Sequence, residues 1–325
     1  MPKILHTYRY TGLPWEILKS VVPEGYTIKT LDEPTYEQLV KEVNDADYLL
    51  VSGRLPIDKG VLDAAKNLKM IQRTGVGTEM LDKEEIKQRN IPVYVNAGVN
   101  ARSVAEHTLT LILACLKRIP IIDKQVRNGI WRKQETGTSC LELYEKTVGI
   151  VGMGAIGRQV AEYLHAFGAR IVYTDIKQLP LEYEKRLNAT YIPSFEDLLK
   201  QVDILSLHCP LMPENKGFIN KGSLSLMKRN SIIINTARGK LINEIDLYNA
   251  LLRGEIRAAG LDVHYEEPIQ LENHQLSKLD NVILTPHIGG LSFETFQTMM
   301  RDAIENIIAY DQGKEFLIKD NRLKL

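Results

Sequence analysis

Three segments in the second half of the chain each carry a side chain that can hold a charge or move a proton. Arg238 lies in IIINTARGKLINE, Glu267 in GLDVHYEEP and His287 in VILTPHIGG. Each segment contains an apolar run typical of a buried strand, and parallel sheets bind ligands at the carboxyl ends of their strands. A guanidinium can hold a carboxylate, and an acid can protonate a developing alkoxide. Taken singly, the three residues would be a surface ion pair, a turn acid and a loop histidine.

A glycine-rich turn comes before these segments. In TVGIVGMGAIG an apolar strand runs into Gly152, Gly154 and Gly157 at GxGxxG spacing, and a helical pattern follows at once. Gly152 permits the tight turn, and Gly154 lets the backbone approach a pyrophosphate. Gly157 lets the helix pack close to the strand, so that its first amides face the phosphates. The pattern predicts a dinucleotide site; its alternative is a turn kept glycine-rich for packing.

Asp175 ends the next strand, RIVYTD, near the distance from the glycines at which a carboxylate binds a ribose 2′-hydroxyl. The same carboxylate would repel a 2′-phosphate, which favours NAD over NADP, although Lys177 could soften that preference. The alternative for Asp175 is a cap on the following turn. A dinucleotide site, a cation and an acid together suit hydride reduction of a 2-keto acid.

Two series of alternating strand and helix patterns position these residues. The first series makes about five βα units by residue 100, and the second starts at the glycine-rich strand. Between them SVAEHTLTLILACLKRI predicts a long helix, with Ser103 as N-cap and Glu106 completing a capping box. The final helix, FETFQTMMRDAIENIIAY, is expected to return to the first domain. We therefore predict an α/β protein of two doubly wound parallel-sheet domains, divided into 1–101 plus 292–325 and 102–291.

The composition excludes several classes of partner. Lys plus Arg and Asp plus Glu both number 41, so no overall charge attracts nucleic acid or an anionic membrane. No apolar run approaches the roughly 18 residues of a spanning helix. The start, MPKILHTYRY, lacks the pattern of a secretory signal, so a cytoplasmic protein is expected. The chain has three cysteines, Cys115, Cys140 and Cys209. They show no metal-ligand spacing, so we expect free thiols and no bound metal.

Seven ordered motifs, spread over nearly the whole chain, resemble the D-isomer-specific 2-hydroxyacid dehydrogenase family, which includes phosphoglycerate, glycerate and D-lactate dehydrogenases. The motifs are RTGVG at 73–77, SVAEH at 103–107, VGMGAIG at 151–157, LHCPL at 207–211, NTARG at 235–239, LDVHYEEP at 261–268 and TPHIGG at 285–290. The resemblance implies a flavodoxin-like substrate-binding domain, a Rossmann NAD-binding domain and NAD-dependent interconversion of a small D-2-hydroxy acid and its 2-keto acid.

Residue by residue, the resemblance implies a catalytic set of Arg238, which anchors and polarises the substrate, His287, which is the acid/base, and Glu267, its partner. A carboxylate beside an imidazole favours the charged ring and orients it. For Asp262 the implied place is near the nicotinamide carboxamide, and the alternative is a strand-end acid bonded to nearby backbone. The implied NAD contacts, beyond the three glycines, are Ala155, Ile156, Asp175, Cys209, Pro210, Thr236, Ala237, Arg238, Asp262, His287, Gly289 and Gly290. Cys209 is expected to pack rather than to react.

In the first domain, the amides of Val76 and Gly77 resemble the family's cradle for the substrate carboxylate. The neighbouring SGRLP loop brings Arg54 and Leu55, either of which could read the substituent of the keto acid. Two departures from the family pattern leave the substrate open: TEMLD follows the cradle where an Asp-Asn pair is common, and His264 takes a place that is commonly aromatic.

Other functions on the same scaffold stay open at this point. An NAD-sensing corepressor-like binding protein could keep the whole catalytic set, and a formate or phosphite dehydrogenase would change the hydride donor. The apolar helix that starts at Ser103 is a candidate homodimer surface by resemblance, and burial within one subunit is its alternative.

Overall fold

The computed structural model describes residues 1–318 and 322–324, and the chain divides into two compact units. The first unit combines Met1–Asn100 with Leu291–Leu325, and the second is Ala101–Gly290. Both are parallel α/β sheets covered by helices, so the predicted fold class is confirmed. The boundaries expected from the sequence differ from the observed ones by one residue.

The first unit holds a five-stranded parallel sheet in the order β2-β1-β3-β4-β5, which is the flavodoxin-like order. Its strands are β1 (Lys3–His6), β2 (Thr27–Thr30), β3 (Tyr48–Val51), β4 (Met70–Arg73) and β5 (Val93–Tyr94). Its helices are α1 (Leu13–Ser20), α2 (Tyr36–Glu42), α3 (Lys59–Ala64), α4 (Lys83–Gln88) and the long α13 (Phe293–Asp311). The predicted return of the final helix to this unit is observed.

The second unit holds a seven-stranded parallel sheet in the order β12-β11-β10-β9-β6-β7-β8. The strand order reverses beside β6, and this is where a doubly wound sheet binds its ligand. The strands are β6 (Thr147–Val151), β7 (Arg170–Thr174), β8 (Ala189–Tyr191), β9 (Ile204–Leu207), β10 (Ile232–Asn235), β11 (Ala258–Leu261) and β12 (Val282–Leu284). The helices are α5 (Ala101–Lys117), α6 (Ile119–Arg127), α7 (Lys133–Thr138), α8 (Ala155–Ala166), α9 (Leu181–Leu187), α10 (Phe195–Leu199), α11 (Lys221–Leu226) and α12 (Glu244–Leu252).

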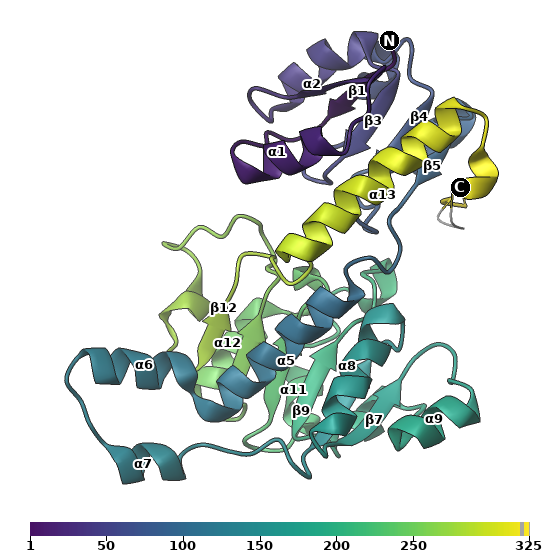
Figure 1. The fold of residues 1–325 in the computed structure, drawn as a ribbon. Helices are drawn as coiled ribbons and strands as arrows, with labels where there is room; N and C mark the ends of the chain where they lie inside the picture. Colours follow the sequence, from purple (N-terminus) through teal and green to yellow (C-terminus); the bar gives the residue numbers. More distant parts are fainter. Residues whose placement is uncertain (319–321, 325) are drawn as a thin grey trace. The chain divides into compact units, whose positions relative to one another are not determined.

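Alternating apolar side chains on the buried strands build two cores in the second unit, one on each face of its sheet. Ile232 and Ile234 pack with α5 and α8, which lie side by side over one face (Figure 1). Ile233 points to the other face, toward α10, α11 and α12. Because both faces are covered, ligands reach this sheet only at the ends of its strands.

The start of α5 differs from the prediction. The helix begins at Ala101, so Ser103 lies inside its first turn rather than at the N-cap. The Ser103 hydroxyl donates to the carbonyl of Gly289 at 2.8 Å, a long-range contact that the capping-box pattern could not reveal. The apolar face of α5, including Leu111 and Ile112, is buried in the core of the unit.

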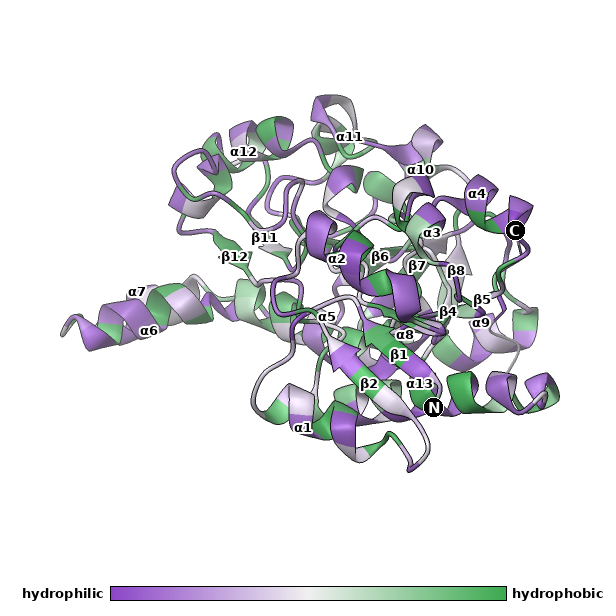
Figure 2. Cartoon of the chain, turned by 90° about the horizontal axis from the view of Figure 1, so that it is seen from above, coloured by the Kyte–Doolittle hydropathy of each residue, from purple (hydrophilic) through white to green (hydrophobic). Residues whose placement is uncertain are grey.

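The segment that follows α5 is exposed. Neither α6 nor α7 has a buried residue, and Figure 2 shows purple and green segments alternating along both helices. Large apolar side chains here face solvent, among them Ile119, Val126 and Trp131, which is 81% exposed. Among the helices that the structure describes, none has the length and apolar character needed to cross a membrane.

Candidate active site

The three candidate catalytic residues follow three neighbouring strands. Arg238 comes after β10, Glu267 after β11 and His287 after β12, and these strands pair in parallel in that order. The carboxyl ends of parallel neighbours meet at one edge of the sheet. The fold therefore delivers all three loops to the same edge, as the sequence analysis expected.

His287 and Glu267 form a direct pair. His287 Nδ1 lies 2.7 Å from Glu267 Oε2, and the other carboxylate oxygen accepts from the backbone N–H of His264 at 3.0 Å. Burial raises the pKa of Glu267, but the hydrogen bonds from His287 and His264 outweigh it, so this pKa lies below its usual value. The carboxylate is thus ionised at neutral pH and can accept only, so His287 Nδ1 must carry a proton.

The backbone at His287 is held in an uncommon conformation. Its φ is +56°, in the left-handed region, and its N–H donates to the carbonyl of Asp262 at 2.7 Å. A non-glycine residue stays there only when its surroundings compensate for the strain. The loop after β12 is therefore shaped to present this imidazole.

Asp262 supplies much of that compensation. It is 1% exposed, and its oxygens accept from the N–H of Ile288 at 2.9 Å, the N–H of Gly289 at 2.8 Å and the hydroxyl of Thr285 at 2.6 Å. His107 Nε2 lies 2.9 Å from that same hydroxyl. Burial raises the pKa of Asp262, yet these donors together lower it to about 2.

The Asp262 carboxylate therefore clamps the loop that carries His287. This corresponds to the alternative considered for Asp262 in the sequence, an acid bonded to nearby backbone. The part played by His107 was missed, although its motif, SVAEH, was recognised. The contact links residues 178 positions apart in the chain, and no local pattern signals it.

The Arg238 loop packs directly on the loop after β11. A Cβ on Gly239 would lie 2.0 Å from the carbonyl carbon of His264, so only glycine fits there. Asn235 fixes the turn, because its amide donates to the carbonyl of Arg238 at 2.9 Å. The half-buried Arg238 guanidinium donates to the carbonyl of Ala237 at 2.7 Å, and Thr236 is bonded through its hydroxyl to α5.

The glycine-rich turn after β6 fits the phosphates of a dinucleotide. Gly152 has φ +94°, and a Cβ there would lie 2.8 Å from the backbone N of Cys209. A Cβ on Gly157 would lie 2.1 Å from the carbonyl oxygen of Gly152, so the helix and the turn touch. At Gly154 a Cβ would meet nothing, so the first turn of α8 faces open space. Ala155 and Ile156 begin that helix, where amides are left for an anion.

Asp175 and Cys209 flank this turn on either side. The Asp175 carboxylate accepts from the N–H of Met153 at 2.6 Å and so lies against the glycine-rich turn, where the fold needs a ribose acceptor. Burial raises the pKa of the Cys209 thiol to about 11, so the thiol stays protonated and packs against the core. Pro210 follows, and its carbonyl accepts from Asn215 at 2.8 Å. These residues fit an NAD site.

The loop after β4 in the first unit carries Val76 and Gly77, the residues expected to form a carboxylate cradle. Within residues 1–318 and 322–324, the amides of Val76 and Gly77 donate to no protein acceptor. Arg73 ties this loop to β3. Its Nε donates to the carbonyl of Gly77 at 2.6 Å, and its Nη1 donates to the carbonyl of Val51 at 2.7 Å. No local sequence pattern signals this use of a buried arginine.

The two candidate specificity residues of the SGRLP loop differ in how far they are exposed. Leu55 is half-buried and packs against the core of the first unit. Arg54 is exposed, and its guanidinium lies 4.6 Å from the centroid of the Tyr8 ring. Of the two, Arg54 is the more exposed side chain.

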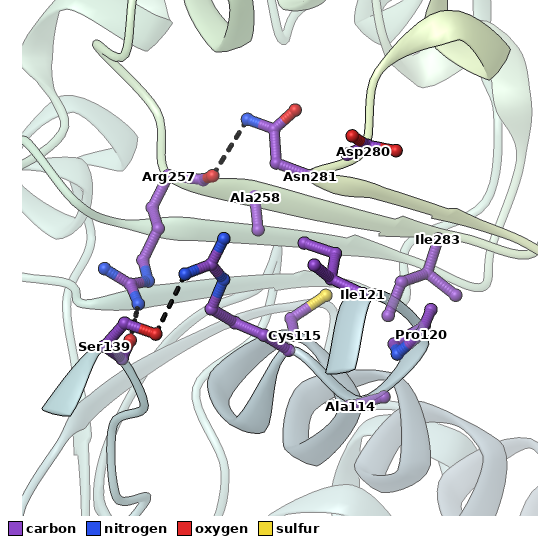
Figure 3. A pocket seen from close by; sticks show the side chains of 11 residues that line it. Ala114, Cys115, Pro120, Ile121, Ser139, Arg257, Ala258, Asp280, Asn281 and Ile283 are labelled. Atoms are coloured by element: carbon purple, nitrogen blue, oxygen red, sulfur yellow. Dashed lines mark hydrogen bonds between the residues drawn. The ribbon is translucent and has the colours of Figure 1, made fainter. Parts of the chain in front are cut away.

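A pocket in the second unit lies at the wrong edge of the sheet for this chemistry. It is lined by residues from the starts of β11 and β12, including Ala258 and Asn281, and by Cys115 and Pro120 from the helical side (Figure 3). Ser139 and Arg257 also line the pocket, and the Ser139 carbonyl accepts a hydrogen bond from the Arg257 guanidinium. The loops that carry Glu267 and His287 leave from the opposite ends of these strands, so we assign this pocket no part in the candidate site.

Comparison with known proteins agrees with this geometry. The family described as "D-isomer specific 2-hydroxyacid dehydrogenase, NAD binding domain" matches residues 109–289. The chain is 38% identical over 315 residues to a glyoxylate reductase of Aeropyrum pernix, covering 92% of each chain. It is also 38% identical to a D-3-phosphoglycerate dehydrogenase of Methanocaldococcus jannaschii, of which it spans only 52%, while 84% of the present chain is covered.

Solved structures give the same result. The D-lactate dehydrogenase of Aquifex aeolicus, complexed with NAD and lactic acid, superposes with a TM-score of 0.87 at 28% identity. The alignment covers 99% of this chain and 98% of that one. The likeness therefore includes both units, each with its own parallel sheet.

Proposed function

Because the chain belongs to the D-isomer-specific 2-hydroxyacid dehydrogenase family and is an NAD-dependent oxidoreductase of 2-hydroxy acids, we propose that it reduces glyoxylate or a similarly small 2-keto acid. Arg238, Glu267 and His287 are its proposed catalytic set. The observation that carries the proposal is the 2.7 Å contact between His287 Nδ1 and Glu267 Oε2 at the ends of neighbouring strands.

The pair moves the proton of the reaction. Glu267 accepts the hydrogen bond from His287 Nδ1 and orients the ring, so that the protonated ring can donate its Nε2 proton to the substrate oxygen. When bound, NADH supplies the hydride that the carbonyl carbon receives. In the reverse direction the neutral ring takes the proton from the hydroxyl of the 2-hydroxy acid. The strained loop clamped by Asp262 keeps this imidazole in place.

The substrate is held through its charge. Arg238 binds the carboxylate and polarises the carbonyl next to it, because a guanidinium is matched to planar oxygen pairs. The free amides of Val76 and Gly77 are proposed as further donors to the carboxylate, and Arg54 or Leu55 as the reader of the substituent. A small substituent is proposed from the name of the Aeropyrum relative, a glyoxylate reductase.

Cofactor contacts are proposed for the loops at the same edge of the second unit. The turn of Gly152, Gly154 and Gly157 would hold the pyrophosphate, and Asp175 the adenosine ribose. The loops that follow β9, β10 and β12 complete the set, with Cys209, Pro210, Thr236, Ala237, Gly289 and Gly290. Asp262 would contact the nicotinamide end while it clamps the loop.

A keto-acid panel tests the proposed function. Purified protein is given NADH with glyoxylate, hydroxypyruvate, pyruvate and a bulky 2-keto acid, and NADH oxidation is followed at 340 nm. We expect the highest kcat/KM with one of the small acids and a D-configured product wherever the product is chiral. No turnover with any of them, with NADH binding intact, would contradict it. NAD reduction by formate or phosphite would assign a different donor.

We further propose a homodimer that buries the exposed apolar side chains of the 119–131 segment. Exposed clusters of this kind mark interfaces, and a second copy of the chain is the partner proposed here. Light scattering should give twice the chain mass, and W131D should shift it toward the monomer. A monomeric wild type would contradict this.

The proposed location is the cytoplasm. Cys115, Cys140 and Cys209 are all free thiols, which suits a reducing compartment. Cell fractionation would test the location, and recovery in a secreted fraction would contradict it.

A further inference from the structure

Two buried histidines and a carboxylate gather next to the loop that carries Glu267. His264 follows β11, His274 lies in the long loop before β12, and Glu244 is the first residue of α12. One possible ligand atom from each lies within 4.8 Å of the other two. All three belong to the second unit, and none is part of the catalytic set.

The His264 ring has one nitrogen that is hydrogen-bonded and one that has no partner among the described residues. Its Nε2 lies 2.9 Å from the carbonyl oxygen of Thr285, which can only accept, so Nε2 carries the proton of the neutral ring. Nδ1 is then left with a lone pair, and no hydrogen-bond partner exists for it among the described residues. The side chain is 7% exposed, so water does not readily replace that partner. Metal-bound histidines are commonly fixed by a backbone carbonyl in this way.

The His274 ring has fewer hydrogen-bond partners than the His264 ring. The residue is 9% exposed, and neither ring nitrogen has a hydrogen-bond partner in the part of the chain that the structure describes. Burial lowers the pKa of His274, although Glu244 partly opposes this, so the ring is neutral at neutral pH. A buried polar group without a partner costs free energy, and a bound cation would remove that cost.

Glu244 brings a carboxylate to the two imidazole rings. Its Oε1 accepts from the N–H of Tyr265 at 2.9 Å, which orients the carboxylate. Its Oε2 lies 3.9 Å from His274 Nε2, too far for a hydrogen bond. A cation placed between these atoms would find two imidazoles and one carboxylate.

From this cluster we propose that Glu244, His264 and His274 bind a divalent first-row metal ion, with zinc as the favoured ion. Two histidines and one carboxylate form a known zinc ligand set that leaves a fourth position to water. Tetrahedral zinc with ligands at about 2.1 Å needs ligand atoms about 3.4 Å apart, so the observed spacing must contract by less than about 1.5 Å.

The bound ion would join three segments of the second unit. It would connect the start of α12, the loop after β11 and the loop before β12. The His264 N–H also donates to Glu267, and its ring donates to Thr285, two residues before His287. The site therefore supports the segments that hold the catalytic pair while taking no part in proton transfer.

The test is zinc binding by the full chain after treatment with a chelator. Calorimetry should show one ion bound per chain, and the melting temperature should rise by about 5 °C when zinc exceeds its Kd by roughly 100-fold. Cobalt in place of zinc should give the visible absorption of a tetrahedral site. Removal of one ligand should weaken zinc binding by more than about 100-fold.

Matched variants locate the site. H264F, which restores an aromatic ring, and H274Q should each abolish stoichiometric binding, with circular dichroism confirming that each is folded. H165Q changes an exposed histidine and should bind zinc like the wild type. H287Q should also bind normally, which separates this site from the catalytic pair and from the proposed function. Absence of binding by the wild type, retained binding in H264F and H274Q, or loss of binding in H287Q would each overturn the proposal.

Discussion

The loop after β6 shapes its site with backbone, whereas the loops after β11 and β12 shape theirs with charged side chains. In the first region Gly152 and Gly157 allow chain segments to touch, and the space beside Gly154 stays open. In the second, the Asp262 carboxylate accepts hydrogen bonds from three residues of the loop after β12, and Glu267 binds the imidazole on that loop. A diphosphate needs amides and room, which backbone provides, whereas proton transfer needs a fixed titratable group.

The two carboxylates of the second region differ in burial and in the number of hydrogen bonds that they accept. Asp262 is buried, and its pKa is lowered to about 2 by four donors. Glu267 is 37% exposed in its side chain and has two donors. The buried carboxylate serves the structure of the loop, and the more exposed one serves the group that reacts. Substitutions at each place should therefore fail in different ways.

The largest effect is expected from H287Q. Glutamine cannot donate the proton, so kcat for the preferred keto acid should fall by about 1,000-fold. NADH affinity, measured by fluorescence titration, should change little, because the loop amides bound to Asp262 remain. Activity within tenfold of the wild type would remove His287 from the mechanism.

The backbone region should respond next. G152A places a Cβ 2.8 Å from the backbone of Cys209 at a φ of +94°, and the combined strain should weaken NADH binding by roughly 100-fold and lower the melting temperature. G154A is the matched comparison. Its Cβ meets no protein atom, so the melting temperature should hold while NADH binding falls. Equal thermal losses in both variants would contradict the division between packing and cofactor space.

D262N tests the structural carboxylate. The amide cannot accept from every loop donor, and the variant should lose about 2 kcal/mol of unfolding free energy at pH 7. Because the folded pKa of Asp262 lies below its unfolded value, its stabilisation is present above pH 4 and lost as pH falls toward 2. Urea unfolding followed by circular dichroism should show this loss in the wild type and a flatter pH dependence in D262N. Identical pH profiles would refute the clamp.

The smallest effect is expected at Asp175. In D175S the carboxylate that accepts from Met153 and would repel a 2′-phosphate is gone, so the NADH over NADPH preference in kcat/KM should drop by about tenfold. An unchanged ratio would show that Asp175 only caps the turn.

Much of this arrangement can be predicted from local patterns. GxGxxG spacing, strand periodicity and the acid after β7 locate the dinucleotide turn, and the residues at strand ends locate Arg238, Glu267 and His287. What could not be predicted depends on contacts between distant residues. The pairing of His107 with Thr285 spans 178 positions, and Ser103 bonds to Gly289 instead of capping α5.

The proposed metal ligands illustrate the same limit. Glu244, His264 and His274 lie on three separate segments with no ligand spacing in the sequence, and only packing brings them together. In the sequence His264 stands out only as a histidine at a place that is commonly aromatic. Buried nitrogens without partners become visible only in a folded structure.

The proposed mechanism depends on Glu267 acting through His287, and the pH profile of E267Q is the sharpest test of it. Glutamine keeps the size of the side chain but removes the negative charge that lies 2.7 Å from His287 Nδ1. We predict that keto-acid reduction by E267Q is about tenfold slower at pH 7 and that its alkaline decline begins at lower pH than in the wild type. A uniformly slower E267Q with an unshifted profile, or a fully active one, would contradict the account.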